Sequence, residues 1–116
     1  MNNIAILLPY KDQFIKDNAG SASIWVKDFS KTSKFKKLTT VFGYTSNTSK
    51  VFDHFKYVNL KFTNFGIQSK NLQYVDKFID ELKKSKFSLI EIHNRPSYIL
   101  HIEKNLPNQK YILVIH

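Results

Sequence analysis

The stretch that decides the fold is Ser88-Leu89-Ile90-Glu91-Ile92-His93-Asn94-Arg95-Pro96, which changes from apolar to polar within a few residues. Side chains alternate along a strand, so Glu91 and His93 share one face and the two isoleucines share the other. His93, Asn94 and Arg95 then stand at the carboxyl end of the strand, the edge where open α/β sheets bind ligands. The proline that follows suits the first turn of a helix. The stretch therefore predicts a strand, a polar corner favourable to anions, and a helix.

The rest of the chain repeats this alternation of apolar strands and amphipathic helices. Predicted strands are 4–8, 38–42, 57–62, 88–93 and 111–115; predicted helices are 21–29, 70–86 and 96–105; the segments 44–55 and 64–69, the latter around Gly66, are predicted loops or turns. The order β-α-β-β-α-β-α-β favours a mostly parallel sheet with helices on both faces. We therefore expect one Rossmann-like α/β domain over residues 1–116, whose last strand is central in the sheet.

The composition limits the classes of function. The net charge is +9, carried by 18 lysine and arginine residues of which Arg95 is the one arginine, and no aromatic and arginine-rich RNA motif accompanies them. We therefore expect no nucleic-acid partner, but a general attraction to phosphates and anionic membrane surfaces. Cysteine is absent, which excludes disulfides and thiolate metal sites. The apolar run 4–8 is too short for a signal peptide or a membrane span, so a cytoplasmic location is expected.

The start of the first predicted helix is a second candidate site. Gly20 precedes Ser21 there, and a glycine beside a helix N-terminus lets backbone N–H groups approach a phosphate. The alternative is purely structural, with Ser21 as the N-cap of the helix.

Glu91, His93, Asn94, Arg95 and His116 are the remaining candidates. Histidine hydrogen-bonds hydroxyl groups and transfers protons near neutral pH, and arginine holds a phosphate or carboxylate through two parallel bonds. A carboxylate within an apolar strand needs a partner, for which we expect Arg95 or a lysine. The structural alternatives are that Arg95 binds backbone carbonyls and that Asn94 caps the next helix. The four histidines lack a metal-ligand spacing, so no metal site is expected.

Three segments together resemble the N-terminal domain of GT-B glycosyltransferases, in particular the retaining enzymes of family 4. The first is strand 4–8 with Pro9 and the loop to Gly20, although the family usually has two glycines where this chain has Ala19-Gly20-Ser21. The second, Glu91 to Pro96, resembles a Glu-x-His-Asn-Arg-Pro signature of some members. The third is strand 111–115, which delivers His116 as the family delivers a histidine.

The resemblance implies an enzyme of the hexosyltransferase type, active in cell-envelope polysaccharide synthesis. The enzyme would move a sugar, with retention, from a nucleotide-sugar to a glycan or lipid-linked acceptor, without a metal or other cofactor. Catalytic roles would fall to His93 and His116, contacts with the donor phosphate to Gly20 and Ser21, and contacts with the acceptor to Glu91, Asn94 and Arg95. Most of the donor would bind a C-terminal domain of a longer protein, so this chain alone should be inactive.

Two other functions stay open at this point. The first is a non-catalytic α/β module that binds a nucleotide or phosphorylated ligand by itself. The second is a basic nucleic-acid-binding domain, for which strongly salt-dependent binding would be the sign.

Overall fold

The computed structural model describes residues 3–62 and 68–116, so the predicted turn around Gly66 lies outside the described residues. The strands are β1 (Ile4–Leu7), β2 (Thr39–Gly43), β3 (Lys56–Asn59), β4 (Leu89–His93) and β5 (Tyr111–Val114). The helices are α1 (Ser21–Thr32), α2 (Lys70–Lys84) and α3 (Pro96–Asn105), with 3-10 turns at Lys36–Leu38 and Thr48–Lys50.

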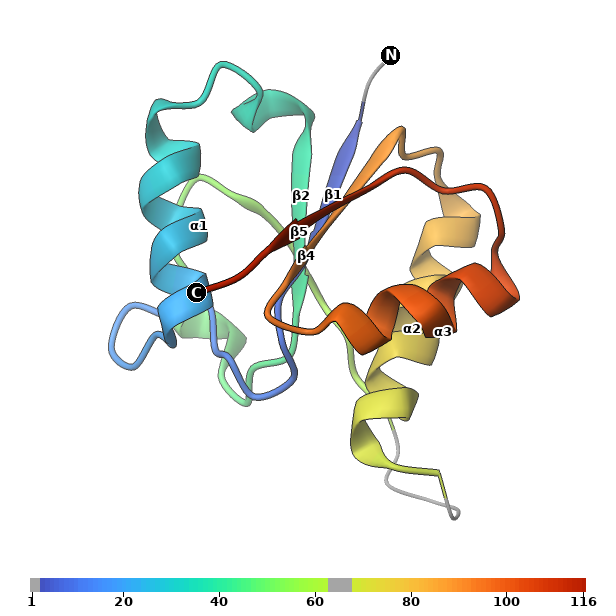
Figure 1. The fold of residues 1–116 in the computed structure, drawn as a ribbon. Coiled ribbons are helices and arrows are strands. Elements are labelled where there is room, and N and C mark those ends of the chain that lie inside the picture. The colour runs from blue at the N-terminus through green and yellow to red at the C-terminus, as the bar shows by residue number, and fades with distance from the viewer. Residues whose placement is uncertain (1–2, 63–67) are drawn as a thin grey trace.

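The strands form one five-stranded sheet in the order β3-β2-β1-β4-β5, and every neighbouring pair is parallel. Figure 1 shows this sheet nearly edge-on, with α1 on one side and α2 and α3 on the other. The predicted α/β class with a parallel sheet and helices on both faces is therefore confirmed. No helix within residues 3–62 and 68–116 is long and apolar enough to cross a membrane.

The α2 and α3 face carries the larger part of the core. Ser69 caps α2 by accepting a hydrogen bond from the backbone N–H of Leu72 at 3.2 Å. The buried stripe of α2 consists of Tyr74, Val75, Phe78, Ile79 and Leu82. The spacing of apolar residues in the sequence predicts Leu72 for this stripe as well, but in the structure Leu72 is 39% exposed. Ile90 and Ile92 of β4 join this core, as their alternation with Glu91 and His93 predicts.

The opposite face is covered by α1 and by the connection between β2 and β3. The spacing of Ala22, Trp25, Val26 and Phe29 in the sequence predicts one apolar stripe on α1. Ala22 and Val26 are fully buried, whereas Phe29 is 57% exposed. The predicted loop 44–55 is more than a surface connection, because its residues Val51 and Phe52 pack against this second core. Apolar residues of the loop thus replace a second helix on this face.

The strand order also shows where the order of the strands reverses, which is between β1 and β4. The chain leaves β1 toward β2 and β3, then returns through α2 to β4 on the other side of β1. In open α/β sheets, ligands bind in the crevice beyond the carboxyl ends of the strands at such a reversal. The crevice lies here between the loops that follow β1 and β4.

The position of β5 corrects the sequence prediction. We expected a central strand, but in the described sheet β5 pairs with β4 alone and forms an edge. Ile112, Leu113 and Ile115 are consequently 44%, 39% and 66% exposed. An entirely apolar strand sequence predicts burial on both faces, but it does not reveal whether neighbouring elements cover those faces.

Candidate functional site

A shallow pocket of about 300 Å³ lies at the carboxyl ends of β1 and β4. It is lined by Pro9, Tyr10, Lys11, Asp12, Gly20, Ser21, Asn94 and Arg95. Gly20, Ser21, Asn94 and Arg95, all predicted from the sequence, therefore share one rim of the sheet. They do so because parallel strands direct their carboxyl ends to the same edge.

Asp12, which sequence reasoning missed, already occupies the N-terminus of α1. Its Oδ2 accepts a hydrogen bond from the backbone N–H of Ala22 at 3.1 Å, and its Oδ1 accepts one from the N–H of Ser23 at 3.1 Å. The Ser23 hydroxyl donates to the same Oδ1. The carboxylate thus stands where a phosphate would otherwise meet these N–H groups. Ser21 is the first residue of α1 rather than its N-cap, a position that belongs to Gly20.

Gly20 has a structural reason to be glycine. A Cβ atom at this position would lie 2.5 Å from Cγ and Oδ1 of Asp12. The backbone of Gly20 is extended, with φ −73° and ψ 172°, so the close approach of Asp12 and not the dihedral angles requires the missing side chain. Contact of Gly20 and Ser21 with a donor phosphate stays a prediction.

Glu91, His93 and His116 form one continuous chain of hydrogen bonds. Oε2 of Glu91 lies 2.7 Å from Nε2 of His93, and Nδ1 of His93 lies 2.9 Å from Nε2 of His116. The side chain of His93 is fully buried and that of Glu91 is 13% exposed. The partner of Glu91 is therefore His93 and not Arg95 or a lysine, which corrects the sequence prediction.

Strand register explains why these three groups meet. Glu91 and His93 alternate onto the same face of β4, and His93 is paired in register with Val114 of β5. His116 follows Val114 by two residues, so the side-chain period brings it to the same face just beyond the strand. Trp25 of α1 covers the group, with ring centroids 5.2 Å from His93 and 5.8 Å from His116. The chain terminus beside α1 is visible in Figure 1.

Asn94 fixes the ends of the two strands to each other. It has a positive φ of 59°, which asparagine tolerates better than most residues. Its backbone N–H donates to the carbonyl of Val114 at 2.8 Å, and its Oδ1 accepts from the backbone N–H of His116 at 2.7 Å. The predicted cap of α3 is therefore wrong, since the N-cap residue of that helix is Arg95 and Asn94 holds His116 in place.

Arg95 is exposed and bridges two pockets. Its Nη1 donates to the carbonyl of Asn94 at 3.1 Å, the loop-anchoring role considered as the structural alternative. Besides the pocket at β1 and β4, it lines a second pocket of about 340 Å³ between the starts of α2 and α3. Tyr98 and His101 line this second pocket, and burial raises the pKa of the Tyr98 hydroxyl. Nε2 of His101 lies 2.7 Å from Oδ1 of Asp76.

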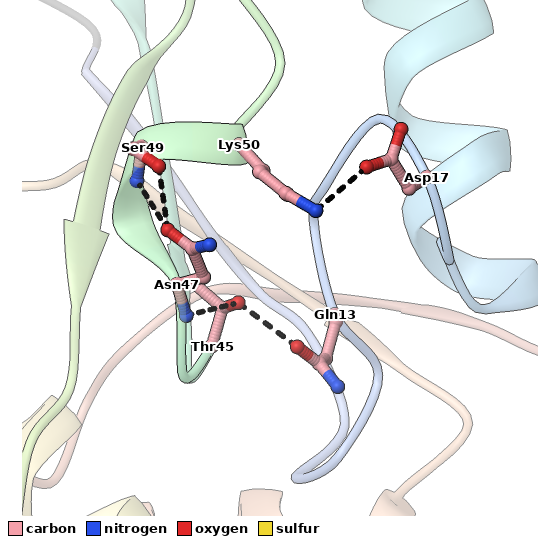
Figure 2. Close-up of polar contacts among 6 residues, drawn as sticks. All are labelled: Gln13, Asp17, Thr45, Asn47, Ser49 and Lys50. Carbon is pink, nitrogen blue, oxygen red and sulfur yellow. Dashed lines mark hydrogen bonds and ion pairs between the residues drawn. The ribbon is translucent and has the colours of Figure 1, made fainter.

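The loop that carries Asp12 is held in place by the connection between β2 and β3 (Figure 2). The hydroxyl of Thr45 donates to Oε1 of Gln13 at 2.9 Å, and Lys50 forms an ion pair with Asp17 at 3.0 Å. Fully buried Phe14 anchors the same loop among the aromatic rings of Phe52, Phe55 and Tyr57. The first loop is therefore a packed element that fixes one wall of the pocket.

Metal binding finds no support in the part of the chain that the structure describes. No group of three or more histidine or carboxylate side chains there is arranged to hold a metal ion. In the Glu91–His93–His116 chain both ring nitrogens of His93 already bond to its neighbours, so the three side chains do not converge on a common point.

Asp12 and Trp25 are the two contributors that sequence reasoning did not assign to the site. Asp12 lies three residues after Pro9 in the first loop, so its position at the carboxyl edge was a usable signal. Nothing in the sequence pattern indicates that Asp12 would bond to the start of a helix that begins nine residues later. Trp25 packs against the core between α1 and the sheet, and its ring also covers both histidines.

No family model matches the chain, and no solved structure matches it significantly. A stretch of 36 residues is 44% identical to a spore coat protein named SA from Bacillus subtilis (strain 168). This stretch covers 31% of the chain and 10% of the length of that protein, so the likeness is local.

Proposed function

We propose that this chain is the N-terminal, acceptor-side domain of a retaining glycosyltransferase of the GT-B type. The full enzyme would transfer a sugar from a nucleotide-sugar to a hydroxyl of a glycan or lipid-linked acceptor. The observation that carries the proposal is the chain of hydrogen bonds that leads from Glu91, within β4, through His93 to His116, which Asn94 holds at the carboxyl edge. These residues are the ones that carry the resemblance to the family.

The chemistry of the edge suits a polyhydroxylated ligand. Imidazole, carboxamide and guanidinium groups offer both donors and acceptors, as the hydroxyl groups of a sugar require. Arg95 adds a positive charge at this edge, and its exposed side chain donates through Nη1 to the carbonyl of Asn94. Positive groups of this kind would also stabilise the charge that develops on a departing diphosphate.

The position of Asp12 supports a donor site that lies mostly in a second domain. A diphosphate at the start of α1 would have to displace a carboxylate that holds two backbone N–H groups and one hydroxyl. The second domain that the resemblance implies would therefore supply most of the groups that bind the donor phosphates. For the same reason a stand-alone phosphate-binding module, the alternative function, has less support from this pocket.

The charge of +9 fits an acceptor at an anionic surface. Clusters of lysine attract acidic membranes through interactions that act over about one Debye length, roughly 10 Å at moderate salt. A lipid-linked acceptor would present its glycan at the cytoplasmic face of such a membrane. We therefore place the enzyme in the cytoplasm, in peripheral contact with that face.

The test uses the parent enzyme, in which the second domain is present. Release of UDP or GDP from a panel of nucleotide-sugars, with and without extracted lipid-linked glycans, measures transfer. We expect Arg95→Ala to lower kcat/KM for the acceptor at least tenfold, which corresponds to about 1.4 kcal/mol of lost transition-state binding. The matched control is Lys104→Ala, which removes an exposed cation from the last turn of α3.

Two outcomes would refute the proposal. The first is unchanged acceptor kinetics in Arg95→Ala, which would remove Arg95 from the site. The second is micromolar binding of UDP-glucose or GDP-mannose to the isolated 116-residue chain. That result would favour the stand-alone module, since our proposal expects the isolated chain to be inactive and to bind these donors weakly.

A further inference from the structure

We propose that Glu91 is a positioning residue that acts through buried His93 to set which ring nitrogen of His116 carries a proton. The outer nitrogen of His116, Nδ1, is thereby kept unprotonated and accepts the proton of a ligand hydroxyl. The inference deepens the proposed function and rests on it only for the identity of the hydroxyl, which would belong to the sugar acceptor.

The argument begins at the carboxylate. An ionised carboxylate only accepts hydrogen bonds, so Nε2 of His93, at 2.7 Å from Oε2 of Glu91, must carry a hydrogen. A neutral imidazole carries one hydrogen, so Nδ1 of His93 is then an acceptor. Nε2 of His116, at 2.9 Å from that Nδ1, must therefore be the donor. In neutral His116 the hydrogen is then on Nε2, and Nδ1 carries a lone pair.

Burial fixes the direction of these hydrogen bonds, in which His116 donates to His93 and His93 donates to Glu91. His93 has no exposed surface, and Glu91 has 13% of its side chain exposed, so water competes poorly for their hydrogen bonds. A carboxylate–imidazole contact is stronger in such surroundings than in water. The ring of Trp25 closes the group on the α1 side. The tautomer of His93 is consequently fixed by one charged acceptor rather than by exchange with solvent.

His116 differs from His93 because it is exposed. Its backbone N–H donates to Oδ1 of Asn94 at 2.7 Å, which fixes the residue beside the pocket lined by Asn94 and Arg95. The ring thus has one nitrogen committed to His93 and one nitrogen that hydrogen-bonds no group in the described ranges. The second nitrogen is the one available to a ligand.

Proton transfer along the hydrogen bonds between His116, His93 and Glu91 needs no further reactant to balance atoms and charge. A ligand hydroxyl gives its proton to Nδ1 of His116 and keeps the O–H electron pair on oxygen. The proton on Nε2 of His116 then passes to Nδ1 of His93, so that the positive charge comes to lie beside Glu91. Glu91 stays ionised throughout, as does the carboxylate that orients the histidine of a serine-protease triad. The hydroxyl oxygen becomes more nucleophilic, as an acceptor in sugar transfer requires.

The experiment reads the tautomers directly. Nitrogen-15 NMR of histidine-labelled 116-residue chain distinguishes protonated from unprotonated ring nitrogens, at a pH where both imidazoles are neutral. In the unmodified chain we expect both rings to carry hydrogen on Nε2 alone. In Glu91→Gln the amide can donate as well as accept, so we expect both rings to shift toward the opposite tautomer. Glu81→Gln is the matched control, because Glu81 pairs with Lys84 on α2 at the opposite face.

A second variant tests whether Glu91 acts through His93. In a His93→Phe background, Glu91→Gln should no longer change the tautomer of His116. A direct effect of Glu91 on His116 would survive in that background and would overturn the proposal. So would hydrogen on Nδ1 of His116 in the unmodified chain, a result that needs no variant to fold. Failure of sugar transfer in the parent enzyme would refute the proposed function and leave these spectra unchanged, so the two failures are distinguishable.

Discussion

Replacing Gly20 with alanine should have effects of opposite sign in two backgrounds, which tests how the first loop is built. In the unmodified chain the new Cβ would lie 2.5 Å from the Asp12 carboxylate, so that side chain must move away. It would then lose its hydrogen bonds to the backbone N–H groups of Ala22 and Ser23, at 3.1 Å each. Loss of such a helix cap costs about 1–2 kcal/mol of unfolding free energy.

The same substitution also has a favourable component. Alanine restricts the unfolded chain more than glycine does, which stabilises a protein by about 0.4–1 kcal/mol where the native backbone allows it. The extended backbone at residue 20 allows it. We therefore expect Gly20→Ala to destabilise the unmodified chain by about 1 kcal/mol. In the Asp12→Ala background, where no carboxylate remains to be displaced, it should stabilise the chain by about 0.5 kcal/mol.

Equilibrium unfolding in urea measures both values, with the fluorescence of Trp25 and far-UV circular dichroism as independent probes. For a chain of this size 1 kcal/mol corresponds to roughly 4 °C in Tm, so thermal scans give a second reading. Gly43→Ala is the matched control. Its Cβ would meet the Tyr57 hydroxyl at 3.1 Å and a methyl group of Leu8 at 3.3 Å rather than Asp12, so its cost should be the same in both backgrounds. Equal costs of Gly20→Ala in both backgrounds would refute the account of Asp12 given above.

Two further predictions concern the packing on which the site depends. Phe14 is fully buried in the first loop, so Phe14→Ala should lower the free energy of unfolding in urea by about 3–5 kcal/mol. Phe14→Leu should keep much of the stability that alanine loses. A cost below about 1 kcal/mol for Phe14→Ala would show that Phe14 does not anchor the loop. Tyr74 donates to the carbonyl of Leu8 at 2.7 Å, and burial raises the pKa of its hydroxyl above 10.0. Because the folded chain keeps this proton where the unfolded chain loses it, stability should fall as the pH rises above about 10, by up to 1.4 kcal/mol per pH unit. Tyr74→Phe should remove that share of the slope and cost about 1 kcal/mol at neutral pH, and an unchanged slope would contradict the assignment.

The sequence predicted the elements well because the signals for them are local. Alternation along β4 correctly placed Ile90 and Ile92 in one core and Glu91 and His93 on the other face. The apolar stripe of α2 and the proline at the start of α3 likewise depend on neighbours a few residues away. Periodicity of 2.0 and 3.6 residues is therefore enough to find the strands and helices.

The contacts within the candidate site depend on the path of the backbone, which periodicity does not encode. We expected Arg95 or a lysine to pair with Glu91, but Nη1 of Arg95 donates to the carbonyl of Asn94 instead. His93 then becomes the partner, through a spacing of two residues that the strand pattern did contain. The role of Asp12 requires a loop to return to the start of α1. That return is fixed by the packing of Phe14, and no local pattern reports it.

Stability alone does not account for Glu91 and His93. A branched apolar residue at either position would satisfy the strand pattern, pack against Trp25 and Ile6, and avoid the cost of removing a carboxylate and an imidazole from water. Buried polar groups that depend on each other for hydrogen bonds are often replaceable by apolar residues without loss of stability. The departure from the local rule runs from Glu91, which lines a pocket of about 500 Å³ beside α1, to His93 at the carboxyl end of β4. Sequences tend to depart from local rules at functional sites, so the cost of burying these two groups is itself an argument that the carboxyl edge binds a ligand.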